Sequence, residues 1–101
     1  MSKKEPGKAD LLLSERTILD DISFADVKVW QVPSPVLGSA HEFKYSLAYV
    51  EGGTCVLRFD NERGKGDHFH LDGQEKPYAF TTLAALYDDF WALVDELRAD
   101  Q

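Results

Sequence analysis

Alternation of apolar and polar side chains is the strongest pattern in the first part of the chain, and it predicts β-strands. Residues 24–32 place apolar side chains at every second position, so a strand there would bury one face and leave the other open. Two prolines follow and end this strand. Residues 9–19 alternate less regularly and predict a further strand. Asp20 and Asp21 predict the turn between the two.

A β-hairpin is predicted over residues 43–60, with its turn at Gly52-Gly53. Both glycines accept the positive φ angles that a two-residue turn between strands requires. The simplest register for such a turn pairs Val50 with Cys55 and continues without a shift. Both faces of the hairpin carry apolar side chains, so the sequence leaves open which face is buried.

Helical spacing replaces alternation near the C-terminus. Thr81 or Thr82 suits the N-cap, because its side-chain oxygen can accept a free backbone N–H of the first turn. The apolar positions that share one helix face are Leu83, Leu86, Tyr87, Phe90, Val94 and Leu97. The predicted fold class is therefore α+β: a curved antiparallel sheet of four to five strands packed by one C-terminal amphipathic helix. Residues 1–7 are predicted to be a disordered leader and residues 8–101 a single domain.

The chain is acidic, but its charge is unevenly distributed. Its 101 residues carry a formal net charge of -7, which argues against non-specific binding to nucleic acid or to an anionic membrane. Much of the acid lies in the predicted helix, whereas residues 58–70 contain as many bases as acids. The overall acidity therefore does not describe that segment.

The cellular location is predicted from cysteine usage and hydropathy. No apolar run has the length of a membrane span or of a signal peptide. The single cysteine, Cys55, cannot form an internal disulfide and is predicted to be a small buried residue. These features predict a protein of the cytoplasm, without a membrane partner.

Reactive side chains gather between residues 61 and 78, on a segment rich in glycine. Arg63 and Lys65 are each followed by a glycine, so the backbone there can approach an anion closely. His68 and His70 bracket Phe69. If this triplet is extended, both imidazoles lie on one face and the phenyl ring on the other. The glycine-rich setting predicts little burial for either histidine.

One interpretation of this segment is a metal site, which would make the chain a metal-dependent hydrolase. Two histidines one residue apart on a strand can converge on one ion. Further ligands would come from His41, Asp67, Asp72 or Glu75. The cations Arg63 and Lys65 disfavour a dication beside them. A plain structural loop, whose histidines hydrogen-bond locally, is the simplest interpretation.

Another interpretation is cleavage of RNA without a metal ion or cofactor. His68 and His70 would act as acid and base, because imidazole exchanges protons near neutral pH. Lys65 and Arg63 would complete the catalytic set by stabilising charge on the phosphate. The predicted substrate-binding residues are Arg58, Tyr78, Phe69 and Asn61, whose aromatic members would stack on bases.

A third interpretation is a non-enzymatic binding or regulatory protein that docks a partner through an exposed sheet face. Both faces of the predicted hairpin are partly apolar, and one helix covers only one of them. We therefore expect either a homodimer or a complex with a protein partner.

Residue blocks at 9–13, 29–33, 41–45 and 55–62 lead to a specific Lys-Gly-Asp-His-x-His block at 65–70. In these blocks, the chain from about residue 8 to 95 resembles the TumE-type family of bacterial toxin–antitoxin proteins. The resemblance implies a small toxin encoded beside a helix-turn-helix antitoxin, which neutralises it and represses the operon. By fold analogy it favours an endoribonuclease acting on RNA. The acidity of the chain departs from what is usual for RNA-directed toxins.

Overall fold

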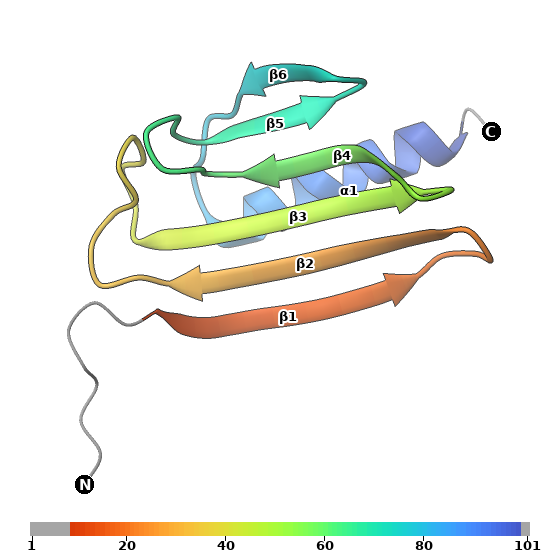
Figure 1. The fold of residues 1–101 in the computed structure, drawn as a ribbon. Helices are drawn as coiled ribbons and strands as arrows, with labels where there is room; N and C mark the ends of the chain where they lie inside the picture. Colours follow the sequence, from red (N-terminus) through yellow and green to blue (C-terminus); the bar gives the residue numbers. More distant parts are fainter. Residues whose placement is uncertain (1–8, 100–101) are drawn as a thin grey trace, which may run out of the picture.

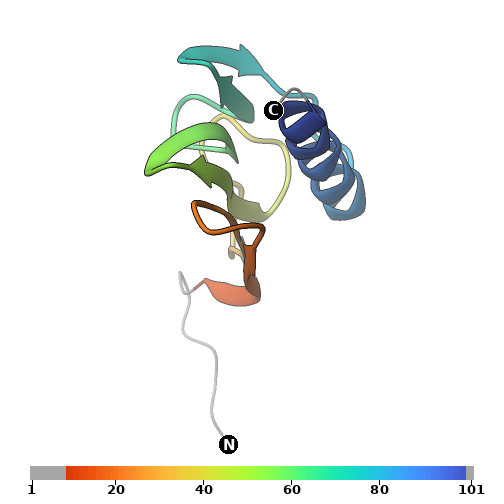
Figure 2. The ribbon, with the colours of Figure 1, turned by 90° about the vertical axis from the view of Figure 1, so that its right-hand side faces the viewer.

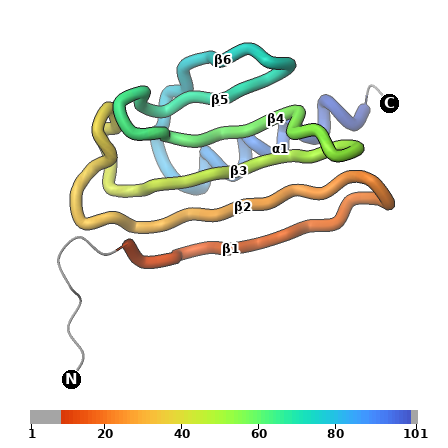
Figure 3. The backbone as a smooth tube through the Cα atoms, viewed as in Figure 1, coloured from red at the N-terminus to blue at the C-terminus, as the bar shows by residue number. Residues whose placement is uncertain are grey.

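Six antiparallel strands follow one another in a single sheet, and one helix lies across one face of it (Figure 1). The computed structural model describes residues 9–99, so the predicted leader at 1–7 lies outside the described residues. The elements are β1 Asp10–Ile18, β2 Ser23–Gln31, β3 Phe43–Glu51, β4 Thr54–Asp60, β5 His68–Leu71, β6 Gln74–Pro77 and α1 Leu83–Ala99. The backbone path is a simple meander from β1 to β6 (Figure 3). The predicted α+β class is confirmed.

The tight turns form where the sequence predicts them. Between β1 and β2, the N–H of Ile22 donates to Asp20 Oδ1 at 2.9 Å, so the aspartate side chain closes the turn. Between β3 and β4, Gly52 and Gly53 adopt φ angles of 58° and 80°. These are the positive angles that the two-residue turn requires.

The register between β3 and β4 differs from the predicted one. Val50 pairs with Cys55 as expected, but the register then shifts, and Tyr49 pairs with Leu57. The unshifted prediction paired Tyr49 with Val56 and is wrong. The shift is a β-bulge, which moves every later residue of β4 to the other face.

The helix covers one face of the sheet and leaves the other uncovered (Figure 2). The buried sheet residues of the covered face come from three strands: Ala25, Val27, Val29, Tyr45, Leu47, Tyr49, Leu57 and Phe59. Leu86, Phe90 and Val94 of α1 complete this core. The opposite face, named the open face here, carries the alternate residues of the same strands.

The capping prediction for the helix is confirmed at Thr82, whose Oγ1 accepts the N–H of Ala85 at 3.0 Å. The predicted apolar stripe faces the sheet, and the acidic residues lie on the exposed side: Asp88, Asp89, Asp95 and Glu96. No helix within residues 9–99 is long and apolar enough to cross a membrane.

The sheet has six strands rather than the predicted four to five. The missed strand, β6, is exposed at all four of its positions, so it lacks the alternation that marks a half-buried strand. It pairs with β5 across a turn at Asp72 and Gly73, both with positive φ. Cys55 is exposed, not buried as predicted, because it lies at the start of β4, close to the β3–β4 turn.

Candidate active site

The register of the sheet brings charged and imidazole side chains into adjacent rows on the open face. One row runs from β2 to β6 through Asp26, Ala48, Arg58, His70 and Glu75. The next row contains Lys28, Ser46, Asp60 and His68. A third pairs Trp30 with Lys44. The small side chains of β3 lie between larger ones on both sides, so the face is hollowed over this strand.

His68 is the most enclosed imidazole of the described residues. Its side chain is 4% exposed, and its Nε2 lies 2.6 Å from Asp60 Oδ1. Its Nδ1 lies 2.9 Å from the carbonyl oxygen of Gly66. A carbonyl oxygen only accepts hydrogen bonds, so Nδ1 carries the ring proton. The predicted exposure of this histidine is wrong, because the preceding loop folds over it.

His70 is the accessible imidazole, with 40% of its side chain exposed. Its ring centroid lies 4.9 Å from that of His68, so both rings share one face, as alternation predicts. The Nε2 atoms of both histidines lie 3.5 Å from Glu75 Oε1. The two imidazoles therefore converge on one position instead of flanking a substrate from opposite sides.

Three residues of this group could hold a metal ion. Asp60, His68 and His70 each offer a ligand atom, and these atoms lie within 4.8 Å of one another. Glu75, a predicted ligand, lies at the edge of the group. Three other predicted ligands are not in it: His41, Asp67 and Asp72.

The predicted loop cations have different surroundings. Lys65 Nζ lies 3.4 Å from Glu62 and 3.6 Å from Glu75. A hydrogen bond to Glu62 and the charge of Glu75 raise the pKa of Lys65, so its positive charge is already offset by two carboxylates. Arg63 is exposed on the same loop and forms no ion pair with another described residue.

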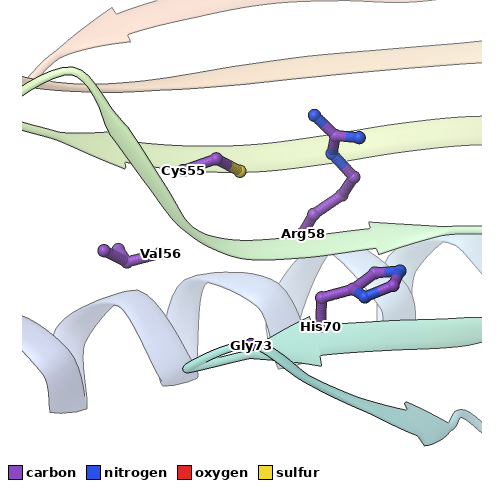
Figure 4. Close-up of a pocket in the computed structure, with 5 residues that line it drawn as sticks. All are labelled: Cys55, Val56, Arg58, His70 and Gly73. Carbon is purple, nitrogen blue, oxygen red and sulfur yellow. The ribbon is translucent and has the colours of Figure 1, made fainter.

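Arg58 and His70 pair across β4 and β5 and project from the open face, with α1 behind the sheet (Figure 4). Together they line two hollows. The larger, about 470 Å³, also includes Trp30, Lys44, Ser46 and Asp60. The smaller, about 260 Å³, includes Cys55, Val56 and Gly73. Arg58 makes no ion pair within residues 9–99, so its guanidinium is available to an anion.

Residues 37–41, between β2 and β3, contact the loop at residues 61–67 that precedes His68. The N–H of Gly64 donates to the carbonyl oxygen of Leu37 at 2.7 Å. The carboxylate of Asp67 contacts three side chains: Ser39, His41 and Tyr45. Burial and the hydrogen bond to Asp67 raise the pKa of Tyr45, which keeps its phenol a donor. Asp67 therefore anchors the backbone directly before His68.

The two loops touch at Gly66, and this contact gives a first prediction. A Cβ added there would lie 2.8 Å from the carbonyl oxygen of Gly38, and the φ angle is +73°. We expect Gly66→Ala to lower the free energy of unfolding by at least about 2 kcal/mol, from strain and overpacking combined. Urea unfolding measures the change.

Gly64→Ala is the matched control for this loss. Its φ is +85°, but an added Cβ would meet nothing within 4 Å. Strain alone should then cost about 1–2 kcal/mol. Equal losses in the two variants would show that the contact between the loops adds no stability.

The sequence of the chain was compared with models of known protein families. The family model described as Toxin TumE matches residues 8–98, which include every residue of the open-face rows. The chain belongs to the TumE toxin family. The resemblance seen in the sequence is thereby confirmed, and the chain is the toxin of a toxin–antitoxin module with an antitoxin as its cognate partner. No curated protein and no solved structure matches the chain.

Asn61, one of the predicted substrate-binding residues of this TumE toxin, lies inside the protein at 1% exposure. Its Oδ1 accepts the N–H of Tyr45 at 3.0 Å, and its Nδ2 donates to the carbonyl oxygen of Phe43 at 2.6 Å. The amide thus joins the end of β4 to β3. A role in substrate binding stays a prediction for this residue.

Two aromatic residues predicted to bind substrate also face the helix side of the TumE toxin. Phe69 stacks on Phe59 with ring centroids 5.1 Å apart. The hydroxyl of Tyr78 donates to Asp89 of the helix at 2.6 Å. Of the four predicted substrate-binding residues, Arg58 lies in the open-face rows, and Asn61 also lines the larger hollow.

The sequence prediction missed Asp60, Trp30 and Lys44 as site residues of the toxin. A signal existed for two of them. Asp60 lies two residues after Arg58 and so shares its face, and Trp30 alternates with buried valines of β2. Their meeting with His70 depends on the pairing of four strands, which no local pattern contains.

Proposed function

We propose that this TumE toxin is a small endoribonuclease of the cytoplasm that cleaves RNA without a metal ion. The observation that carries the proposal is the Arg58–His70 pair, which lines both hollows of the open face. A phosphate over this pair would place one nucleotide in each hollow. Trp30 in the larger hollow offers a ring on which a base can stack.

The residues at the pair supply the groups that the cleavage needs. The 2′-oxygen of the substrate forms a bond to phosphorus while the bond to the 5′-oxygen breaks. Asp60, which lies beside the buried His68, would take the 2′-hydroxyl proton, and His70 would protonate the leaving 5′-oxygen. Arg58 would stabilise the added charge on the phosphate. The burial of His68 favours Asp60 over it as the base.

We also propose a helix-turn-helix antitoxin as the partner. The edge strand β1 supports a protein contact there, because its leucines and isoleucine are exposed: Leu11, Leu12, Leu13 and Ile18. A homodimer through the same edge stays a prediction.

Incubation of the purified toxin with RNA in a metal chelator tests the function. We expect cleavage, and we expect Arg58→Ala to slow it by about a hundredfold or more, since it removes the charge on the developing phosphorane. Lys76→Ala is the control, because it removes an exposed positive charge on β6 outside both hollows. Intact RNA with the parent protein, or full activity of Arg58→Ala, would refute the proposal.

A further inference from the structure

Two polar atoms at the base of the site lie buried without a hydrogen-bond partner among the described residues. They are Asp60 Oδ1 and His68 Nε2. The atoms are 2.6 Å apart, yet their relative direction does not fit an N–H···O bond. Buried polar atoms are nearly always partnered. The pair therefore points to a ligand that contacts both atoms.

The tautomer of His68 determines the charge that the ligand must carry. Its Nδ1 donates to the carbonyl oxygen of Gly66 at 2.9 Å, so in the neutral ring Nε2 carries a lone pair. This lone pair faces a carboxylate oxygen of Asp60, and two electron-rich atoms repel each other. A cation that accepts both lone pairs removes the repulsion. Metal-bound histidines commonly donate their other ring N–H to a backbone carbonyl in this way.

His70 supplies a third donor to the same point. The ligand atoms of Asp60, His68 and His70 lie within 4.8 Å of one another, and an ion about 2.1 Å from each fits such a group after small side-chain movements. Glu75 Oε1 lies 3.5 Å from both Nε2 atoms, close enough to become a fourth ligand. Its partial exposure, with that of His70, gives an ion access from solvent.

The type of the donors selects the class of ion. Two imidazoles and one carboxylate suit Zn²⁺ and neighbouring transition metals, whereas Mg²⁺ prefers oxygen ligands alone. Lys65 does not oppose a dication as the sequence suggested, since Glu62 and Glu75 both lie within 4 Å of its ammonium.

We infer that Asp60, His68 and His70 form a binding site for one divalent transition-metal ion, for which Zn²⁺ is the probe. The carboxylate of Asp60 and the imidazole lone pair of His70 would both coordinate the ion. The proposed cleavage needs both groups free. Metal binding and cleavage therefore exclude each other, and this consequence rests on the proposed function.

Isothermal titration of the tag-free protein with Zn²⁺ tests the site. We expect one Zn²⁺ per chain and no comparable binding of Mg²⁺. His70→Ala and Asp60→Asn should each weaken the affinity at least about tenfold. Cys55→Ser is the control, because its exposed thiol lies in the smaller hollow but outside the ligand group, and it should bind like the parent. Absence of binding, or parental affinity in both ligand variants, overturns the site.

An RNA assay separates this inference from the proposed function. Cleavage in chelator that stops with one equivalent of Zn²⁺ supports both. Cleavage that requires Zn²⁺ leaves the metal site standing and overturns the metal-independent reaction. If RNA is cleaved in chelator and titration shows no Zn²⁺ binding, the proposed function stands and the metal site fails.

Discussion

Growth arrest by the toxin should be lost in His70→Ala, while the melting temperature stays almost unchanged. The side chain is 40% exposed and forms no part of the buried core, so its removal should cost less than about 1 kcal/mol. Loss of a group that transfers a proton in the reaction should slow it about a hundredfold or more. Induction in growing cells measures the arrest, and thermal melts of the purified variant measure the stability.

Lys76→Ala is the control for His70→Ala. Lys76 is exposed on β6, at the same end of the sheet, and pairs with Phe69, whose side chain points to the helix side. This variant should remain fully toxic and melt like the parent. If His70→Ala also remains fully toxic with an unchanged melt, His70 is not catalytic.

The sequence predicts the part of the site that depends on one strand only. His68 and His70 are two residues apart on β5, and alternation is enough to put both rings on one face. It does not reveal that His68 is buried, because the covering loop is held by residues 37–41, among them Gly38, which Gly66 contacts. That contact joins segments far apart in sequence and leaves no periodic pattern.

The register shift in the β3–β4 hairpin shows why the other site residues were harder to predict. Without the bulge, Arg58 would share a face with Leu47 and Tyr49 and lie under the helix. With it, Leu57 and Phe59 take those positions, and Arg58 turns to the open face. Both faces of β4 are partly apolar, so hydrophobicity alone did not select the register.

Elements with strong periodicity were predicted well, whereas the exposed edge strand β6 was not. β2 and α1 each bury one clear face, and the structure places both within one or two residues of the prediction. β6 buries nothing, so its formation depends on pairing with β5 alone. Glu75, which reaches both histidines from β6, could be proposed as a ligand but not placed.

Phe90→Ala should unfold the toxin at a much lower temperature than any open-face variant. Phe90 is 0% exposed and meets Phe59 edge-on, with ring centroids 6.1 Å apart. Removal of a buried phenyl ring costs about 3–5 kcal/mol, through lost burial and the cavity that remains. In a domain of this size each kcal/mol lowers the melting temperature by about 4–8 °C. We therefore expect a drop of at least about 12 °C.

Leu37→Ala is the control for Phe90→Ala, because it also removes a large apolar side chain, but one that is 63% exposed. It should change the free energy of unfolding by less than about 1 kcal/mol. Phe90→Ala should lose toxicity at temperatures where it unfolds and regain it on cooling, since Arg58, Asp60 and His70 remain in the chain. Toxicity that stays absent in the folded variant would show that the helix face takes part in function directly. A melting temperature close to that of the parent would show that α1 does not hold the core as its contacts indicate.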